Sequence, residues 1–136
     1  MAIETLPGTR IDDAIALWHE AGLTRPWNDP HDDLRRALAG PASTVLAGIE
    51  DERLLSTAMV GHDGHRGWVY YVAVRPDARG RGHGRAIMRA CEAWLAERAI
   101  AKLNLMIRAD NRAASGFYAA LGYATDDVLV LSRRLG

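Results

Sequence analysis

The sequence has 136 residues, of which 49% are hydrophobic and 25% are charged. These proportions are typical of a folded globular domain and exclude a disordered tail. Lys and Arg number 17, as do Asp and Glu, so the formal net charge of +0 gives no whole-chain argument for a nucleic-acid or membrane-surface partner. We therefore expect one domain over residues 1–136.

Cysteine content and hydropathy predict the compartment. The single cysteine, Cys91, cannot form an internal disulfide, and no apolar run reaches the roughly 18 residues that a membrane-spanning helix needs. The first ten residues lack the basic and apolar regions of a secretory signal. We expect a cytoplasmic protein, in which Cys91 is a small buried apolar side chain rather than a nucleophile.

The first half of the chain predicts a strand, two helices and a β-hairpin. Prolines exclude regular helix over residues 23–30, since each proline favours extended backbone at the residue before it. The predicted elements are a strand over 3–6, a helix from a capping box at Thr9 and Asp12 to Gly22, a helix with Asp29 as its N-cap, and strands over 44–49 and 54–60.

The second half predicts alternating strands and helices. The aromatic and β-branched run over 68–74 is typical of a strand buried on both faces. The elements that follow are a helix from about Gly82, a strand through Leu103, Leu105 and Ile107, a helix that ends at Gly122, and a closing strand over 128–131. This order predicts a mixed α/β architecture.

Glycine and arginine alternate in the loop that joins the 68–74 strand to the next helix. Gly80, Gly82 and Gly84 allow unusual backbone angles, so that consecutive N–H groups can point at one anion. The spacing does not match a dinucleotide-binding Gly-x-Gly-x-x-Gly pattern, and no Lys-Ser or Lys-Thr pair completes a P-loop. A tight turn with solvated arginines is the simpler alternative, but three alternating glycines exceed what such a turn needs.

Two motifs carry a family resemblance. Arg79-x-x-Gly82-x-Gly84 after Val72-Ala-Val74 resembles the coenzyme A loop of GNAT-type N-acetyltransferases. Asn111-x-x-Ala114-x-x-Phe117-Tyr118-x-x-x-Gly122-Tyr123 is similar to the second signature of that family, and the segments 23–30 and 61–65 resemble its small YpeA-like bacterial branch. The element order also matches, which implies the GNAT fold: a mostly antiparallel mixed sheet flanked by about four helices.

The resemblance implies acetyl-CoA as co-substrate and assigns its site. In this family the pantetheine arm pairs with the fourth strand, and the pyrophosphate binds the backbone of the glycine loop. The residues that the resemblance assigns to coenzyme binding are Val72, Ala73, Val74, Arg79, Gly80, Arg81, Gly82, His83, Gly84, Asn111 and Tyr118.

Tyr118 matches the general acid of the family. A phenol with a pKa near ~10 can protonate a departing thiolate whose conjugate acid has a pKa near ~8.5. Without the resemblance, Tyr118 is most simply a core aromatic residue, and Asn111 is a helix N-cap that can also bind the coenzyme arm. Some relatives carry a glutamate base where this chain has Met106, so the amine's proton must leave through water or another group.

The acceptor side of the site is predicted from topology. The segment after the first helix and the turn before the 68–74 strand are expected to converge there. The candidate substrate residues are Trp27, Asn28, Asp29, Asp63, His65 and Tyr70, of which Asp63, His65 and Tyr70 are also candidate proton acceptors. Trp27 serves equally well as a packing residue. His62, Asp63 and His65 lack the further ligands of a closed metal site, so no metal is expected.

The sequence therefore predicts an acetyl-CoA-dependent N-acetyltransferase that moves an acetyl group directly to a primary amine of a small molecule or peptide. The alternative is a noncatalytic acyl-CoA-binding sensor or interaction module, which the absence of the glutamate at Met106 keeps open. Neither a nucleic-acid nor a membrane partner is expected, and a homodimer is left open. The Arg-Gly-Arg-Gly segment is a weak nucleic-acid motif, because no aromatic residues are interleaved with it.

Overall fold

The computed structural model describes residues 2–136, which form two compact units. One unit extends to Met106 and holds a five-stranded sheet with three α-helices, and the other, Ile107–Gly136, holds one α-helix. Three strand pairings are antiparallel and one is parallel. This confirms the predicted mixed α/β class with a mostly antiparallel sheet.

The sheet follows the order of the sequence. Its strands are β1 (Ala2–Thr5), β2 (Ser43–Glu50), β3 (Arg53–His62), β4 (Gly67–Val74) and β5 (Leu103–Leu105), and β4 pairs with β5 in parallel. The predicted hairpin of β2 and β3 is confirmed, but β3 continues to His62. The turn between β3 and β4 is therefore shorter than the sequence indicated.

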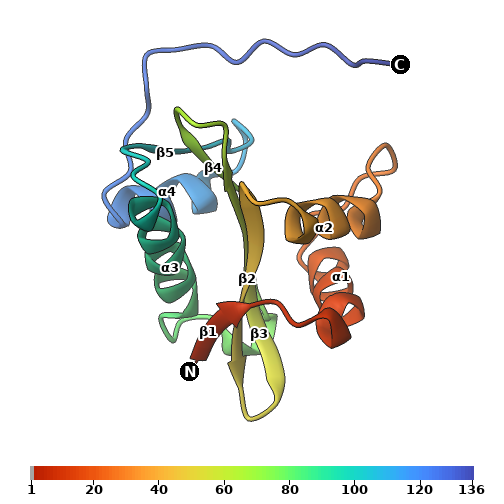
Figure 1. Ribbon diagram of the computed structural model, residues 1–136. Helices are drawn as coiled ribbons and strands as arrows, with labels where there is room; N and C mark the ends of the chain where they lie inside the picture. Colours follow the sequence, from red (N-terminus) through yellow and green to blue (C-terminus); the bar gives the residue numbers. More distant parts are fainter. Residues whose placement is uncertain (1) are drawn as a thin grey trace. The chain divides into compact units, whose positions relative to one another are not determined.

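Helices cover both faces of this sheet (Figure 1). Helices α1 (Ile11–Glu20) and α2 (Pro30–Ala39) lie on one face, and α3 (His83–Glu97) lies on the other. Trp18 of α1 and Leu34 of α2 are fully buried between these helices and the sheet. Cys91 of α3 is fully buried, as predicted. Burying each large apolar side chain stabilises the fold by roughly 1.5–3 kcal/mol. Among residues 2–136, no helix has the length and apolar character needed to cross a membrane.

The two helix starts of the first half differ in how well they were predicted. Asp29 is the N-cap of α2, with its Oδ1 accepting the Asp32 N–H at 3.2 Å, which confirms the prediction. The capping box at Thr9 is wrong. Thr9 lies in a short 3₁₀ helix, η1 (Gly8–Arg10), in which the Arg10 N–H donates to the Pro7 carbonyl. That turn leads directly into α1, which has no side-chain cap.

The second unit contains α4 (Arg112–Ala120), whose N-cap is Asn111. The Asn111 side-chain oxygen accepts the Ala114 N–H at 3.1 Å, which confirms the predicted capping role. The predicted strand over 128–131 is wrong: no strand is present there, and Leu129 and Leu131 are 88% and 87% exposed. Apolar β-prone residues form a strand only when a neighbouring strand pairs with them, and none does here.

Candidate functional site

Strand β4 has an open edge. Strand β5 pairs only with Gly67, Trp68 and Val69, the first three residues of β4. On the same side, residues 70–74 have no strand partner in the part of the chain that is described. Free N–H and C=O groups along such an edge can bind an extended ligand as an added strand. The predicted residues Val72, Ala73 and Val74 lie on this edge.

A β-bulge interrupts β4 at the start of the open edge. Met59 of β3 faces Tyr70, and Thr57 faces Ala73, so that Tyr71 and Val72 together oppose a single residue of β3. Tyr71 has φ of 53°, a left-handed conformation that is rare for a bulky residue. Tyr71 and Ala73, which are two residues apart, both pack against the core of α1 and α2.

Contacts with α1 hold the bulge in place. The Trp18 indole N–H donates to Thr57 Oγ1 at 2.8 Å, and that hydroxyl donates to the Tyr71 carbonyl at 3.1 Å. The rings of Trp18 and Tyr71 stack with centroids 3.9 Å apart. A left-handed backbone conformation at a residue such as Tyr71 costs roughly 1–3 kcal/mol, and it persists only where the surrounding contacts hold it. The backbone of the bulge is therefore held in a fixed position.

A glycine loop follows β4 after the short helix η2 (Pro76–Ala78). Gly80 and Gly82 have φ of 79° and 83°, and a Cβ built on either meets no atom within 4 Å. Gly82 is the N-cap of α3 and provides no side-chain cap, and the first turn of α3 contains no acidic residue. The N–H groups of that turn are thus suited to bind an anion.

The charged side chains of the loop point outward, whereas His83 is buried. Arg79 and Arg81 are exposed. His83 is 6% exposed, and its backbone N–H belongs to the first turn of α3. We therefore expect His83 to contribute its main-chain N–H to an anion site, as Gly82 and Gly84 do, and not its imidazole ring.

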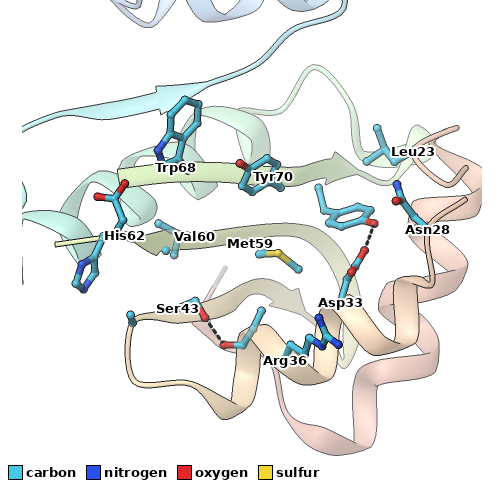
Figure 2. A pocket seen from close by; sticks show the side chains of 15 residues that line it. Leu23, Asn28, Asp33, Arg36, Ser43, Met59, Val60, His62, Trp68 and Tyr70 are labelled. Carbon is cyan, nitrogen blue, oxygen red and sulfur yellow. Dashed lines mark hydrogen bonds between the residues drawn. The ribbon is translucent and has the colours of Figure 1, made fainter. Parts of the chain in front are cut away.

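A cavity of about 730 Å³ lies between α2 and the strands β2, β3 and β4 (Figure 2). Its aromatic wall consists of Trp68, Tyr70 and Tyr71. Successive residues of a regular strand point to opposite faces, so only the bulge allows both tyrosines to line one cavity. Tyr70 is also the first residue of β4 after the segment that pairs with β5, so it belongs both to the cavity wall and to the open edge.

Asp33 is the polar residue that the sequence analysis missed. Its Oδ2 accepts a hydrogen bond of 2.8 Å from the Tyr71 hydroxyl, which Figure 2 shows at the wall of the cavity. Burial and the Asp33 carboxylate raise the pKa of Tyr71 to about 12, so this hydroxyl is a donor at neutral pH. The local sequence carried no signal for Asp33, because its partner Tyr71 lies 38 positions away.

The predicted acceptor residues divide into two groups. Asn28, Asp63 and Tyr70 line the cavity, whereas Trp27, Asp29 and His65 are not among its lining residues. The Asp63 Oδ1 accepts the N–H groups of His65 and Arg66 at 2.9 and 2.8 Å, and these bonds lower the pKa of the Asp63 carboxyl. Tyr70 is 44% exposed, and burial of the rest of its side chain raises its pKa.

Tyr118 lies in the second unit, on α4. It is half-buried, with its ring centroid 4.9 Å from that of Phe117 and 5.8 Å from that of Tyr123, both in edge-to-face geometry. Met106, at the end of the first unit, is 52% exposed. Among residues 2–136 there is no group of three or more His, Cys, Asp and Glu side chains that could hold a metal ion.

Comparison with known proteins extends over almost the whole chain. The model of the acetyltransferase (GNAT) family matches residues 12–123. An acetyltransferase of Yersinia enterocolitica is 39% identical over 99% of this chain and 96% of its own length. One of Pectobacterium atrosepticum is 41% identical over 89% of this chain and 86% of its own. The solved structure of AAC(6')-Iy, in complex with a bisubstrate analog containing CoA, has a TM-score of 0.84 at 14% identity, over 99% of this chain and 98% of that one.

Proposed function

Because the chain belongs to the GNAT family and is an acetyl-CoA-dependent N-acetyltransferase, we propose that it moves the acetyl group directly to a primary amine of a small molecule or peptide. The observation that carries the proposal is the position of the open β4 edge, directly before the glycine loop. An extended thioester arm needs an open strand edge, and the anionic pyrophosphate next to it needs a loop of main-chain N–H groups.

The residues of the first unit fit the two ends of the coenzyme. The backbone of Val72, Ala73 and Val74 pairs with the pantetheine arm as an added strand. Main-chain N–H groups from Arg79 to Gly84, with the partial positive charge of the α3 N-terminus, bind the pyrophosphate. The empty space beside Gly80 and Gly82 supports this assignment, since a close-lying phosphate needs it.

The transfer forms a C–N bond and breaks a C–S bond. A backbone N–H at the β4 bulge polarises the thioester carbonyl, while the neutral amine attacks its carbon. Tyr118 donates a proton to the departing thiolate, and Asn111 binds the coenzyme arm. The proton that the nitrogen loses leaves through water or through Asp63, His65 or Tyr70.

The cavity beside β4 is the acceptor site in this proposal. It reaches Tyr70, where the open edge begins, so an amine in the cavity has access to a thioester bound at the bulge. The structure of AAC(6')-Iy in complex with the bisubstrate analog CoA-S-monomethyl-acetylneamine supports a continuous path of this kind in a protein of the same fold.

A panel of acceptors tests the proposal. Purified protein with acetyl-CoA is incubated with small amines, polyamines, amino acids and peptides, and each product is analysed by mass spectrometry. We expect acetylation on nitrogen of at least one primary amine and none on its alcohol analogue. Acetyl found on oxygen would overturn the choice of a primary amine.

A further inference from the structure

The proposed function leaves the Asp33 carboxylate without a role, although it lies on the wall of the acceptor cavity. Its Oδ2 is bonded to the Tyr71 hydroxyl, and no positively charged side chain among residues 2–136 forms an ion pair with it. A carboxylate at the wall of a partly enclosed cavity, without a counter-ion of its own, attracts a cation. The following inference rests on the proposed function.

The other charged or titratable side chains at the cavity wall form contacts that do not involve the bulge. Arg36 has its Nε 3.4 Å from Oδ2 of Asp32, and Asp63 Oδ1 is bonded within its own turn. His62 accepts the Gly64 N–H on its Nδ1 at 3.0 Å. Asp33 contacts the bulge through Tyr71, and it is therefore the carboxylate in this cavity that is best placed to bind a cationic group of a ligand that reacts at β4.

The distance between the Asp33 carboxylate and the β4 backbone decides which nitrogen of an acceptor the carboxylate binds. The Tyr71 side chain and one hydrogen bond span that whole separation, since the tyrosine belongs to the bulge and its hydroxyl contacts Asp33. A nitrogen that reacts at the bulge lies about one tyrosine side chain away from the carboxylate. A carboxylate beside the reacting amine would also stabilise its protonated, unreactive form.

We propose that Asp33 binds a second positive charge of the acceptor, so that the preferred substrates are diamines or larger polycationic amines. The carboxylate holds one end of the molecule, and the other end reacts at β4. The alkyl chain between the two nitrogens packs along Tyr70 and Tyr71, and the aromatic rings of the cavity wall also attract the cation. Tyr71 is a positioning residue for Asp33.

Matched acceptors test this inference with the full-length chain. They are cadaverine, the amino alcohol of the same chain length, and the ω-amino acid of the same length, which differ only in the charge of the remote group. At saturating acetyl-CoA we expect kcat/KM for cadaverine to exceed that for the amino alcohol by roughly 10- to 100-fold, as for a hydrogen bond between charged groups. The amino acid should be the poorest acceptor.

Variants identify the residue responsible. Asp33→Asn should raise the KM for cadaverine and bring kcat/KM for cadaverine close to kcat/KM for the amino alcohol. The kcat/KM for the amino alcohol and the KM for acetyl-CoA should stay unchanged. Tyr71→Phe should reduce the same preference less strongly. Asp13→Asn, on α1, removes an equal charge outside the cavity and should leave the preference intact.

The results separate this inference from the function on which it rests. An amino alcohol acetylated as well as the diamine, a diamine that is not acetylated, or a preference that survives in Asp33→Asn would each overturn the role of Asp33. Acetylation of other amines would in those cases leave the proposed function standing. Absence of acetyl transfer to every amine in the wider panel would overturn both.

Discussion

The Tyr71 hydroxyl donates a 2.8 Å hydrogen bond to Asp33 Oδ2 and thereby joins β4 to α2. One residue of this pair lies in the bulge at the open strand edge, and the other lies on the wall of the cavity. The proposed coenzyme and acceptor sites are consequently connected through a single side chain. The same hydrogen bond makes the stability of the fold depend on pH.

Replacing Tyr71 with Phe should make the free energy of unfolding depend less on pH in the alkaline range. The pKa of Tyr71 is raised from its ordinary 10.0 to about 12, so its contribution is fully present below pH 10 and is lost as the pH rises through 12. Urea unfolding across this range should show a steeper fall in the free energy of unfolding for the wild type than for Tyr71→Phe. Equal slopes for the two proteins would contradict the raised pKa.

Replacing Gly82 with Val should abolish coenzyme A binding. Val strains a backbone with φ of 83° by roughly 1–2 kcal/mol, and its side chain fills the space beside the α3 N-terminus. Gly22→Val is the matched control, since Gly22 has φ of 72° and lies outside the loop. Both variants should lose similar stability, but calorimetry should show lost binding for Gly82→Val alone. Unchanged affinity in a folded Gly82→Val protein would move the pyrophosphate site elsewhere.

Replacing Tyr118 with Phe should lower kcat by roughly ten- to ten-thousand-fold while coenzyme A still binds. The ring that packs on Phe117 and Tyr123 remains, and only the proton donor is removed. Tyr123→Phe removes a hydroxyl from the neighbouring ring and should leave kcat near the wild-type value. Full activity of Tyr118→Phe would leave Tyr118 with a packing role.

Replacing Asp63 with Asn should alter acceptor kinetics, whereas Trp27→Ala should change them little. Asp63 lines the cavity and Trp27 is not among its lining residues. Asn keeps an Oδ1 that can accept the N–H groups of the turn, so this variant isolates the charge. Steady-state kinetics with a good amine should show a higher KM for Asp63→Asn at an unchanged acetyl-CoA dissociation constant. The reverse ranking of the two variants would place the acceptor nearer to Trp27.

Local sequence rules predicted the elements that depend on local chemistry. Asp29 and Pro30 begin α2 because a side-chain acceptor and a fixed φ act within a few residues, and the glycines before α3 act over an equally short range. The strand at 128–131 was wrong because a strand needs a partner, which composition does not reveal.

The main features of the cavity could not be predicted because they arise from distant contacts. The bulge depends on the bond from Trp18 to Thr57, which lie 39 positions apart in the sequence. Asp33 was not singled out from the sequence, because its position at the cavity wall follows from its contact with Tyr71, 38 positions away. The open edge of β4 similarly follows from the short length of β5, which ends at Leu105 rather than at Ile107 as predicted.

Amine-dependent release of free coenzyme A thiol from acetyl-CoA tests the central claim most directly. Thiol and acetylated amine are measured together, with and without the protein and with and without the amine. The account predicts that both products form in equal amounts, and only when protein and amine are both present. Tight binding of acetyl-CoA without any amine-dependent thiol release would contradict it.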